Sequence, residues 1–260
     1  MTYLKPLVAL VATLLGLATS AIAQTTSFGL DPAKLEFTAA PGQTISGTVT
    51  VVARNDGQSL IASPRDFSLD STGQVTFFRA GSLDRSASNW LSITPESFNV
   101  PAKGSATVTV KARVPANEKL NGAYWGAVDF APTAKANSSA GMALNVHIAL
   151  VVYVTVGQQS PKGLTANLKW DAVNGLFKFT FQNKGNTVLR PKGMLTLVNA
   201  GGVKVATIPV DDFVCLPGGQ LNGAVKFPAG TRPPAGSYIA VLSFSAEGMK
   251  PVATQVSVQL

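Results

Sequence analysis

The feature that most constrains the fold is a strict alternation of apolar and polar residues that recurs along the chain. In SATVTVKARV, residues 105–114, every second side chain is apolar and the intervening ones are polar or charged. Successive side chains of a β-strand point to opposite faces, so this pattern is typical of a strand with one buried face. TISGTVTVVA, residues 44–53, repeats the pattern and is followed by the turn sequence NDG. Gly and Pro interrupt every stretch of helical periodicity after the N-terminus, which favours an all-β fold.

Two series of such segments follow one another, separated by the polar, Gly- and Pro-containing linker GQQSPKG at 157–163. Turn signals recur at the spacing expected of β-sandwiches. We therefore predict two immunoglobulin-like β-sandwich domains in tandem, at 24–157 and 158–260. The first has strands near 28–37, 44–53, 62–70, 74–79, 89–99, 105–114, 121–130 and 142–156. The second has strands near 164–171, 175–182, 192–199, 202–208, 212–215, 219–227, 236–246 and 251–260.

The first 23 residues have the pattern of a secretory signal peptide. Lys5 precedes an apolar run from Leu7 to Ala18, and ATSAIA then places small residues before Gln24. This order predicts cleavage between Ala23 and Gln24. The run is shorter than the roughly 20 residues that a spanning helix needs, so we expect no stable membrane insertion. The mature protein is expected in the periplasm or, as an alternative, at the cell surface.

Charge and composition exclude several classes of function. The formal net charge is +8, and loss of the signal peptide removes one lysine and no acid, which leaves +7. The basic residues are scattered, without the basic stripe interleaved with aromatics that nucleic-acid binding favours, so no nucleic-acid partner is expected. His147 is the single histidine and Cys215 the single cysteine. No metal, cofactor or catalytic residue is predicted, because neither a multi-histidine site nor a nucleophile with a nearby base is available.

Parts of the two halves resemble each other. VPANEKLNGAYWGAVDF and FPAGTRPPAGSYIAVLSF both have a Pro-Ala turn, a Gly, a Tyr two residues later and a Phe six residues after that. These residues are Tyr124 with Phe130 and Tyr238 with Phe244. Duplication of one sandwich unit accounts for the match. Each Tyr is a candidate tyrosine corner, in which the hydroxyl binds nearby backbone at the start of a late strand.

The two-sandwich layout, with a first domain that ends in a long apolar strand, resembles the periplasmic chaperones of the chaperone-usher pilus pathway. The resemblance is clearest from Asn89 to Gly157, and in all it covers about a third of the chain. There WLSITPESFNVPAKGSATVTVKARVP is similar to a strand, Pro-rich turn and strand of that family. NGAYWGAVDF and the long strand after it resemble the last hairpin of the family's first domain. The chain therefore resembles a divergent member of this chaperone family.

The resemblance implies binding of an unfinished pilin subunit by strand addition. The segment MALNVHIALVVYVTV, residues 142–156, matches that role, and it follows the small-residue loop TAKANSSAG at 133–141. The alternative is that this strand only fills its own core. From Ile148 onward both faces are apolar, which indicates burial on both sides. The predicted partner-binding residues lie on one face: Met142, Leu144, Val146, Ile148, Leu150 and Val152.

The chain also departs from that family. Its chaperones hold the terminal carboxylate of the subunit with an Arg on the first strand and a Lys on the last. Here no Lys or Arg occurs between Lys135 and Lys162, and the first strand offers only Lys34. No anchoring residue is carried over.

Two functions from different classes remain. The first is a periplasmic chaperone-like protein that binds fimbrial subunits by β-strand addition. The alternative is a structural or adhesive envelope protein that binds another surface protein or a glycan through its loops. An enzyme is not expected, and the sequence does not indicate an oligomeric state.

Overall fold

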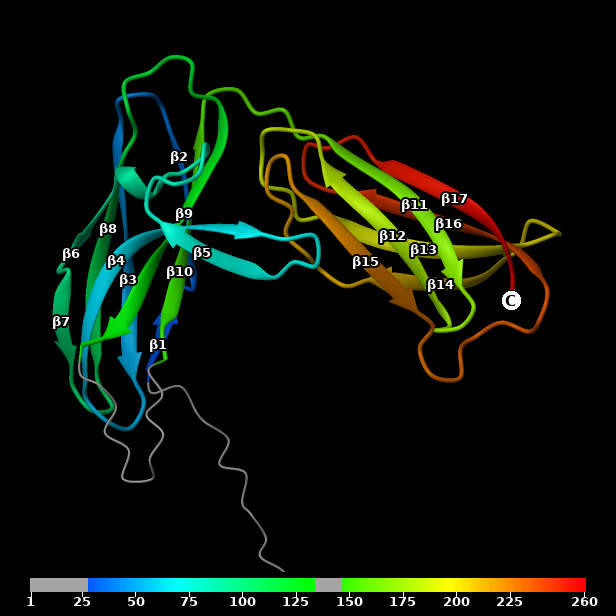
Figure 1. Ribbon diagram of the computed structural model, residues 1–260, viewed down its shortest axis with the longest axis horizontal. Coiled ribbons are helices and arrows are strands. Elements are labelled where there is room, and N and C mark those ends of the chain that lie inside the picture. The colour runs from blue at the N-terminus through cyan, green and yellow to red at the C-terminus, as the bar shows by residue number, and fades with distance from the viewer. Residues whose placement is uncertain (1–27, 134–145) are drawn as a thin grey trace, which may run out of the picture.

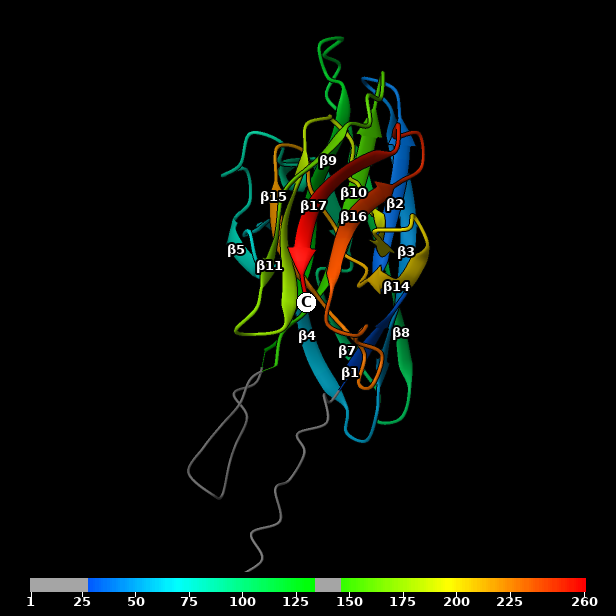
Figure 2. The same cartoon turned by 90° about the vertical axis from the view of Figure 1, so that its right-hand side faces the viewer.

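The computed structural model describes residues 28–133 and 146–260. Within these ranges the regular structure is β-strand, apart from one short 3-10 helix at Ser88–Trp90. The strands form four sheets, which Figure 1 shows as two sandwiches joined at an open angle. In Figure 2 the second sandwich lies in front of the first. The prediction of an all-β, two-sandwich protein is confirmed.

The first sandwich packs a four-stranded sheet against a six-stranded one. The smaller sheet has the order β1-β3-β8-β6, and the larger has the order β2-β10-β9-β4-β5, with β7 also paired to β4. The inward side chains of both sheets form one core that includes the fully buried Phe28, Phe130 and Leu150. The strands are β1 (Phe28–Asp31), β2 (Lys34–Ala39), β3 (Thr44–Ala53), β4 (Gln58–Leu69), β5 (Val75–Arg79), β6 (Leu91–Thr94), β7 (Ser97–Val100), β8 (Ser105–Arg113), β9 (Gly122–Pro132) and β10 (Ile148–Val156).

The second sandwich combines a sheet of order β11-β12-β15 with one of order β14-β13-β16-β17. Aromatic rings dominate its core, and the centroids of Phe181 and Phe244 lie 5.1 Å apart in an edge-to-face pair, a favourable arrangement of ring quadrupoles. The strands are β11 (Gly163–Asp171), β12 (Leu176–Asn183), β13 (Lys192–Asn199), β14 (Lys204–Val210), β15 (Gln220–Lys226), β16 (Ser237–Ser245) and β17 (Val252–Gln259).

Four predicted strands are wrong in extent. In the segment 142–156 the strand begins only at Ile148, and the described residues 146 and 147 lie before it. The segments 28–37 and 89–99 each divide near a proline, Pro32 and Pro95, and the two pieces join different sheets. Proline has no N–H to continue a ladder, which suits a change of sheet at these points. The segment 212–215 is not a strand: Cys215 alone forms an isolated bridge, with Leu189. It crosses from the sheet of β14 to the sheet of β15, so it has no continuous strand neighbour.

The duplicated Tyr–Phe pairs occupy equivalent strands. Strand β9 lies between β4 and the final strand β10 of its sandwich, and β16 lies in the same way between β13 and β17. Tyr238 donates its hydroxyl hydrogen to the carbonyl of Pro234 at 2.9 Å, as a tyrosine corner does. Tyr124 takes another role: its ring packs on Trp90, with centroids 4.7 Å apart.

A buried carboxylate fixes the loop that follows β5. Asp66 on β4 is fully buried and accepts hydrogen bonds from the Ser86 hydroxyl at 2.5 Å and the Leu83 amide at 2.9 Å. Burial by itself raises the pKa of Asp66, but these hydrogen bonds outweigh it and leave the pKa below its ordinary value. The ionised form of Asp66 therefore stabilises the fold.

The two sandwiches share a small apolar cluster. Leu216 of the second sandwich is almost fully buried against Phe67, Trp125 and Tyr153 on the outer face of the six-stranded sheet. The Trp125 indole N–H donates to the Phe67 carbonyl at 2.9 Å, which satisfies the one polar atom of that buried ring. The second sandwich therefore covers part of this outer face.

Polar contacts accompany the cluster at the linker. The main-chain carbonyl of Asn186 accepts a hydrogen bond from the Ala123 amide at 2.6 Å. The side-chain oxygen of Asn186 accepts a second one from the Ser160 amide at 2.7 Å. Arg190 forms an ion pair with Glu36 on β2, and its guanidinium lies 5.2 Å from the centre of the Tyr153 ring. These contacts tie the linker and the β12–β13 connection to the first sandwich.

Candidate partner-binding edge

Strand β10 is the segment in which the sequence predicts partner binding. It pairs antiparallel with β9 along its whole length, from Ile148 opposite Phe130 to Val156 opposite Gly122. Met142 and Leu144 of the predicted set lie outside the described residues, as does most of the loop 133–141.

The other side of β10 is covered over only part of its length. Strand β2 pairs with it in parallel from Val151 opposite Lys34 to Val156, beginning with a 3.2 Å hydrogen bond from the Val151 amide to the Ala33 carbonyl. In the described part of the chain, no strand pairs with this side of residues 146–150. The cause is the change of sheet at Pro32, because β1 pairs with β3 in the opposite layer. An uncovered strand edge of this kind is a template for another strand.

The predicted side chains differ in how much of them the protein already uses. Leu150 and Val152 are fully buried in the core of their own sandwich. Ile148 is half-buried and packs against the same core, and Val146 is half-buried just before the strand. Val152 also has Leu35 of β2 beside it on the covered side. The open stretch therefore begins where the inward side chains are least enclosed, at Val146 and Ile148.

The opposite face of β10 is apolar where the second sandwich covers it. Val151 and Tyr153 belong to the cluster around Leu216, so the prediction of burial on both sides is confirmed for this part of the strand. Burial raises the pKa of the Tyr153 hydroxyl, and the nearby Arg190 opposes this rise. His147 is exposed, and its Nδ1 lies 3.1 Å from an Asp129 carboxylate oxygen.

The Glu36 carboxylate forms ion pairs with two basic side chains beside the part of β10 that β2 covers. Lys34, the loose anchor candidate, has its Nζ 3.3 Å from a Glu36 oxygen, and Arg190 pairs with the other Glu36 oxygen. Sequence reasoning missed Arg190 because it lies in the second sandwich, more than 150 residues from Glu36. No local pattern around Arg190 marks it as a neighbour of β2.

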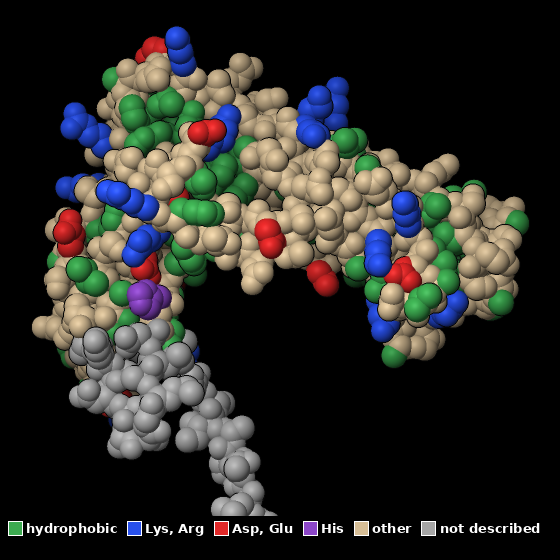
Figure 3. Space-filling view, in the orientation of Figure 1, with side chains coloured by type: hydrophobic (Ala, Val, Ile, Leu, Met, Phe, Trp, Pro, Cys, Tyr) green, Lys and Arg blue, Asp and Glu red, His purple; other side chains and the backbone are tan. Residues whose placement is uncertain are grey.

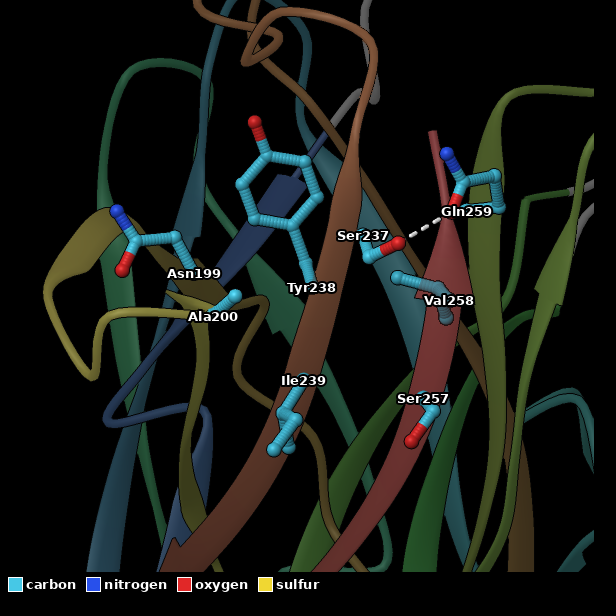
Figure 4. A pocket seen from close by; sticks show the side chains of 8 residues that line it. All are labelled: Asn199, Ala200, Ser237, Tyr238, Ile239, Ser257, Val258 and Gln259. Carbon is cyan, nitrogen blue, oxygen red and sulfur yellow. Dashed lines mark hydrogen bonds between the residues drawn. The ribbon is translucent and has the colours of Figure 1, made fainter.

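A groove of the second sandwich offers hydroxyl and amide groups (Figure 4). It has a volume of about 470 Å³ and lies over the ends of β13, β16 and β17. In it the Ser237 hydroxyl donates to the Gln259 side-chain oxygen at 2.7 Å. Its lining includes no carboxylate, imidazole, thiol or amine; it consists of Asn199, Ala200, Ser237, Tyr238, Ile239, Ser257, Val258 and Gln259.

Within residues 28–133 and 146–260, no group of three or more His, Cys, Asp or Glu residues is placed to hold a metal ion. No helix in these ranges is long and apolar enough to cross a membrane.

Comparison with known proteins identifies the fold. No protein-family model and no curated protein sequence matches the chain. Among solved structures, one described as a chaperone–tip adhesin complex in the biogenesis of CFA/I fimbriae matches with a TM-score of 0.52 and 13% identity. The class 5 fimbriae chaperone CfaA matches with a TM-score of 0.51 and 13% identity. Each match covers 88% of this chain and 98% of the other. The chain therefore has the two-domain, immunoglobulin-like fold of the fimbrial chaperones.

Proposed function

We propose that the protein is a periplasmic chaperone that binds subunits of a surface appendage by adding one of their strands to β10. The observation that carries the proposal is the open side of 146–150, the first residues of β10 and the two just before it, because the rest of β10 is paired on both sides. The fold adds support, since one structure that shares it is described as a chaperone with a tip adhesin.

In this proposal a subunit strand forms main-chain hydrogen bonds with residues 146–150, in line with β2. Val146 and Ile148, with Met142 and Leu144 from the preceding segment, lend apolar side chains to the unfinished core of the subunit. Leu150 and Val152 continue the same face into the chaperone's own core. Their burial holds the strand in an extended conformation before binding, which reduces the entropy lost on association.

The same proposal covers location and chemistry. Cleavage after Ala23 would release the mature chain into the periplasm, where such subunits pass. Strand addition uses main-chain hydrogen bonds and apolar contacts only, so it calls for no cofactor and no catalytic group.

Co-expression with a β-rich secreted subunit encoded next to the gene tests the proposal. The mature protein should co-purify with that subunit, and Ile148→Asp should reduce recovery of the complex at least about tenfold, because burying an unpaired carboxylate is costly. Ile239→Asp is the matched control, since Ile239 is 42% exposed on the second sandwich and should leave the complex intact. Circular dichroism should show that both variants are folded.

An undiminished complex with folded Ile148→Asp would refute the assignment of this strand. Recovery of the protein at the cell surface, with binding that depends on loop 133–141 instead, would support the adhesive alternative and contradict the chaperone.

A further inference from the structure

The six-stranded sheet has a second open edge, at β5. This strand pairs only with β4 among the described residues, from Leu69 opposite Val75 to Arg65 opposite Arg79. All five of its residues are exposed, and Phe77 is 51% exposed. Edge strands are usually protected by charges, prolines or bulges. Strand β5 instead presents large apolar side chains beside an uncovered main chain.

The direction of the main-chain groups shows which residues are open to pairing. The Asp70 amide donates to the Gln74 carbonyl at 3.0 Å, which marks this pair as hydrogen-bonded. Hydrogen-bonded and non-hydrogen-bonded pairs alternate in an antiparallel ladder. The N–H and C=O groups of Val75 and Phe77 therefore point away from β4, toward the free side.

A cavity of about 540 Å³ adjoins β5 on the outer face of the sheet. Arg65 and Arg79 lie side by side in register there, and both line the cavity. Asp129 is shared: one of its oxygens lies 3.8 Å from the Arg65 Nε, and the other 3.1 Å from the His147 Nδ1. Within the described residues Arg79 has no ion pair. Figure 3 shows histidine, acidic and basic side chains gathered on this face of the first sandwich.

We propose that β5 and this cavity form a second docking site, which binds an extended segment of a partner protein. On the side of that segment that faces the cavity, made up of every second residue, apolar and acidic side chains follow one another. The segment pairs with the outward main-chain groups of Val75 and Phe77. One of its apolar side chains lies beside Phe77, and an acidic one lies beside Arg79, where it offsets the two adjacent guanidinium groups.

The main-chain edge of this site is a different strand from the proposed subunit edge. Three inter-strand steps separate β10 from β5 in the sheet order, which places the two strands roughly 14 Å apart. His147 and Ala149 of the open stretch also line the cavity, so the two sites adjoin, but the pairing groups of the second site belong to β5 alone.

A labelled peptide of repeating Thr-Val-Thr-Glu, in which Val and Glu follow one another on a single face, tests the proposal when it is titrated with the mature protein and followed by fluorescence anisotropy. Binding should be saturable, and Arg79→Glu should weaken it at least about tenfold, the change expected when a favourable charge contact becomes repulsive. A peptide of repeating Thr-Val-Thr-Lys should bind Arg79→Glu better than it binds the unmodified protein. Lys111→Glu, at an exposed position of β8, is the control for net charge and should have little effect.

Two further probes separate strand pairing from simple charge attraction. Val75→Pro removes one outward N–H at an edge position where proline is tolerated, and it should abolish binding. The Thr-Val-Thr-Glu peptide methylated on alternate amides should not bind either. Equal binding of the methylated peptide, or binding unaffected by Arg79→Glu, would overturn the proposal. Ile148→Asp should leave peptide binding unchanged, and its loss in that variant would place the peptide on β10 instead.

Discussion

The stability of the contact between the two sandwiches should depend on Leu216, and the substitution Leu216→Ala tests this. Leu216 is 4% exposed. Among the described residues it is the one buried side chain that the second sandwich contributes to the shared cluster. Its partners Phe67, Trp125 and Tyr153 lie on the sheet that contains both proposed binding edges. Loss of this contact should loosen the docking of the sandwiches without removing either core.

The expected cost follows from burial. Leu→Ala at a buried site costs about 2–5 kcal/mol, the sum of lost transfer free energy and the cavity left behind. Half-buried Leu69 and Val188 border the cluster, so water can reach part of the space, and the low end, about 2–3 kcal/mol, is expected. In a chain of this size 1 kcal/mol corresponds to about 2–4 °C in Tm, so the Tm of the docked form should fall by roughly 4–12 °C.

Differential scanning calorimetry and tryptophan fluorescence measure this change. The fluorescence should respond because Trp125 lies in the cluster. Leu164→Ala is the control, since Leu164 is 46% exposed on β11 and should change the Tm by little. A Tm for folded Leu216→Ala within 1 °C or so of the unmodified protein would refute the reasoning that this contact holds the sandwiches together.

Two predictions concern titratable groups. Because the folded-state pKa of Asp66 is lowered, its stabilising effect is present above the ordinary carboxyl pKa and is lost as the pH falls through the lowered value. Asp66→Asn should cost about 2–4 kcal/mol at neutral pH and give a shallower acid dependence of the urea midpoint, whereas parallel curves for the two proteins would contradict this role. Burial raises the pKa of the Cys215 thiol to about 11, so a thiol reagent at about pH 8 should label it only after unfolding in guanidinium chloride. Rapid labelling of the native protein would show that the Cys215 site opens.

Sequence periodicity was sufficient for the fold class because it is a local property. Alternation along 44–53 and 105–114 places one set of side chains inward whatever the strand's neighbours are, and β3 and β8 do pair across those residues. The same logic indicated one apolar face along 142–156, and Leu150 and Val152 on that face are buried. It failed near Pro32 and Pro95, where apolar patterning continues while the chain moves to another sheet.

Which strand edges stay open was decided only by the tertiary structure. Pairing joins residues that are far apart in sequence: Val151 meets Lys34, while β5 has no partner beyond β4 in the described chain. The contact of Arg190 with Glu36 likewise depends on how one sandwich docks on the other. A period-two pattern specifies which face of a strand is buried, but it carries no information about which strand lies alongside. Such pairing depends on the whole chain because it exchanges main-chain hydrogen bonds that every residue type except proline can make.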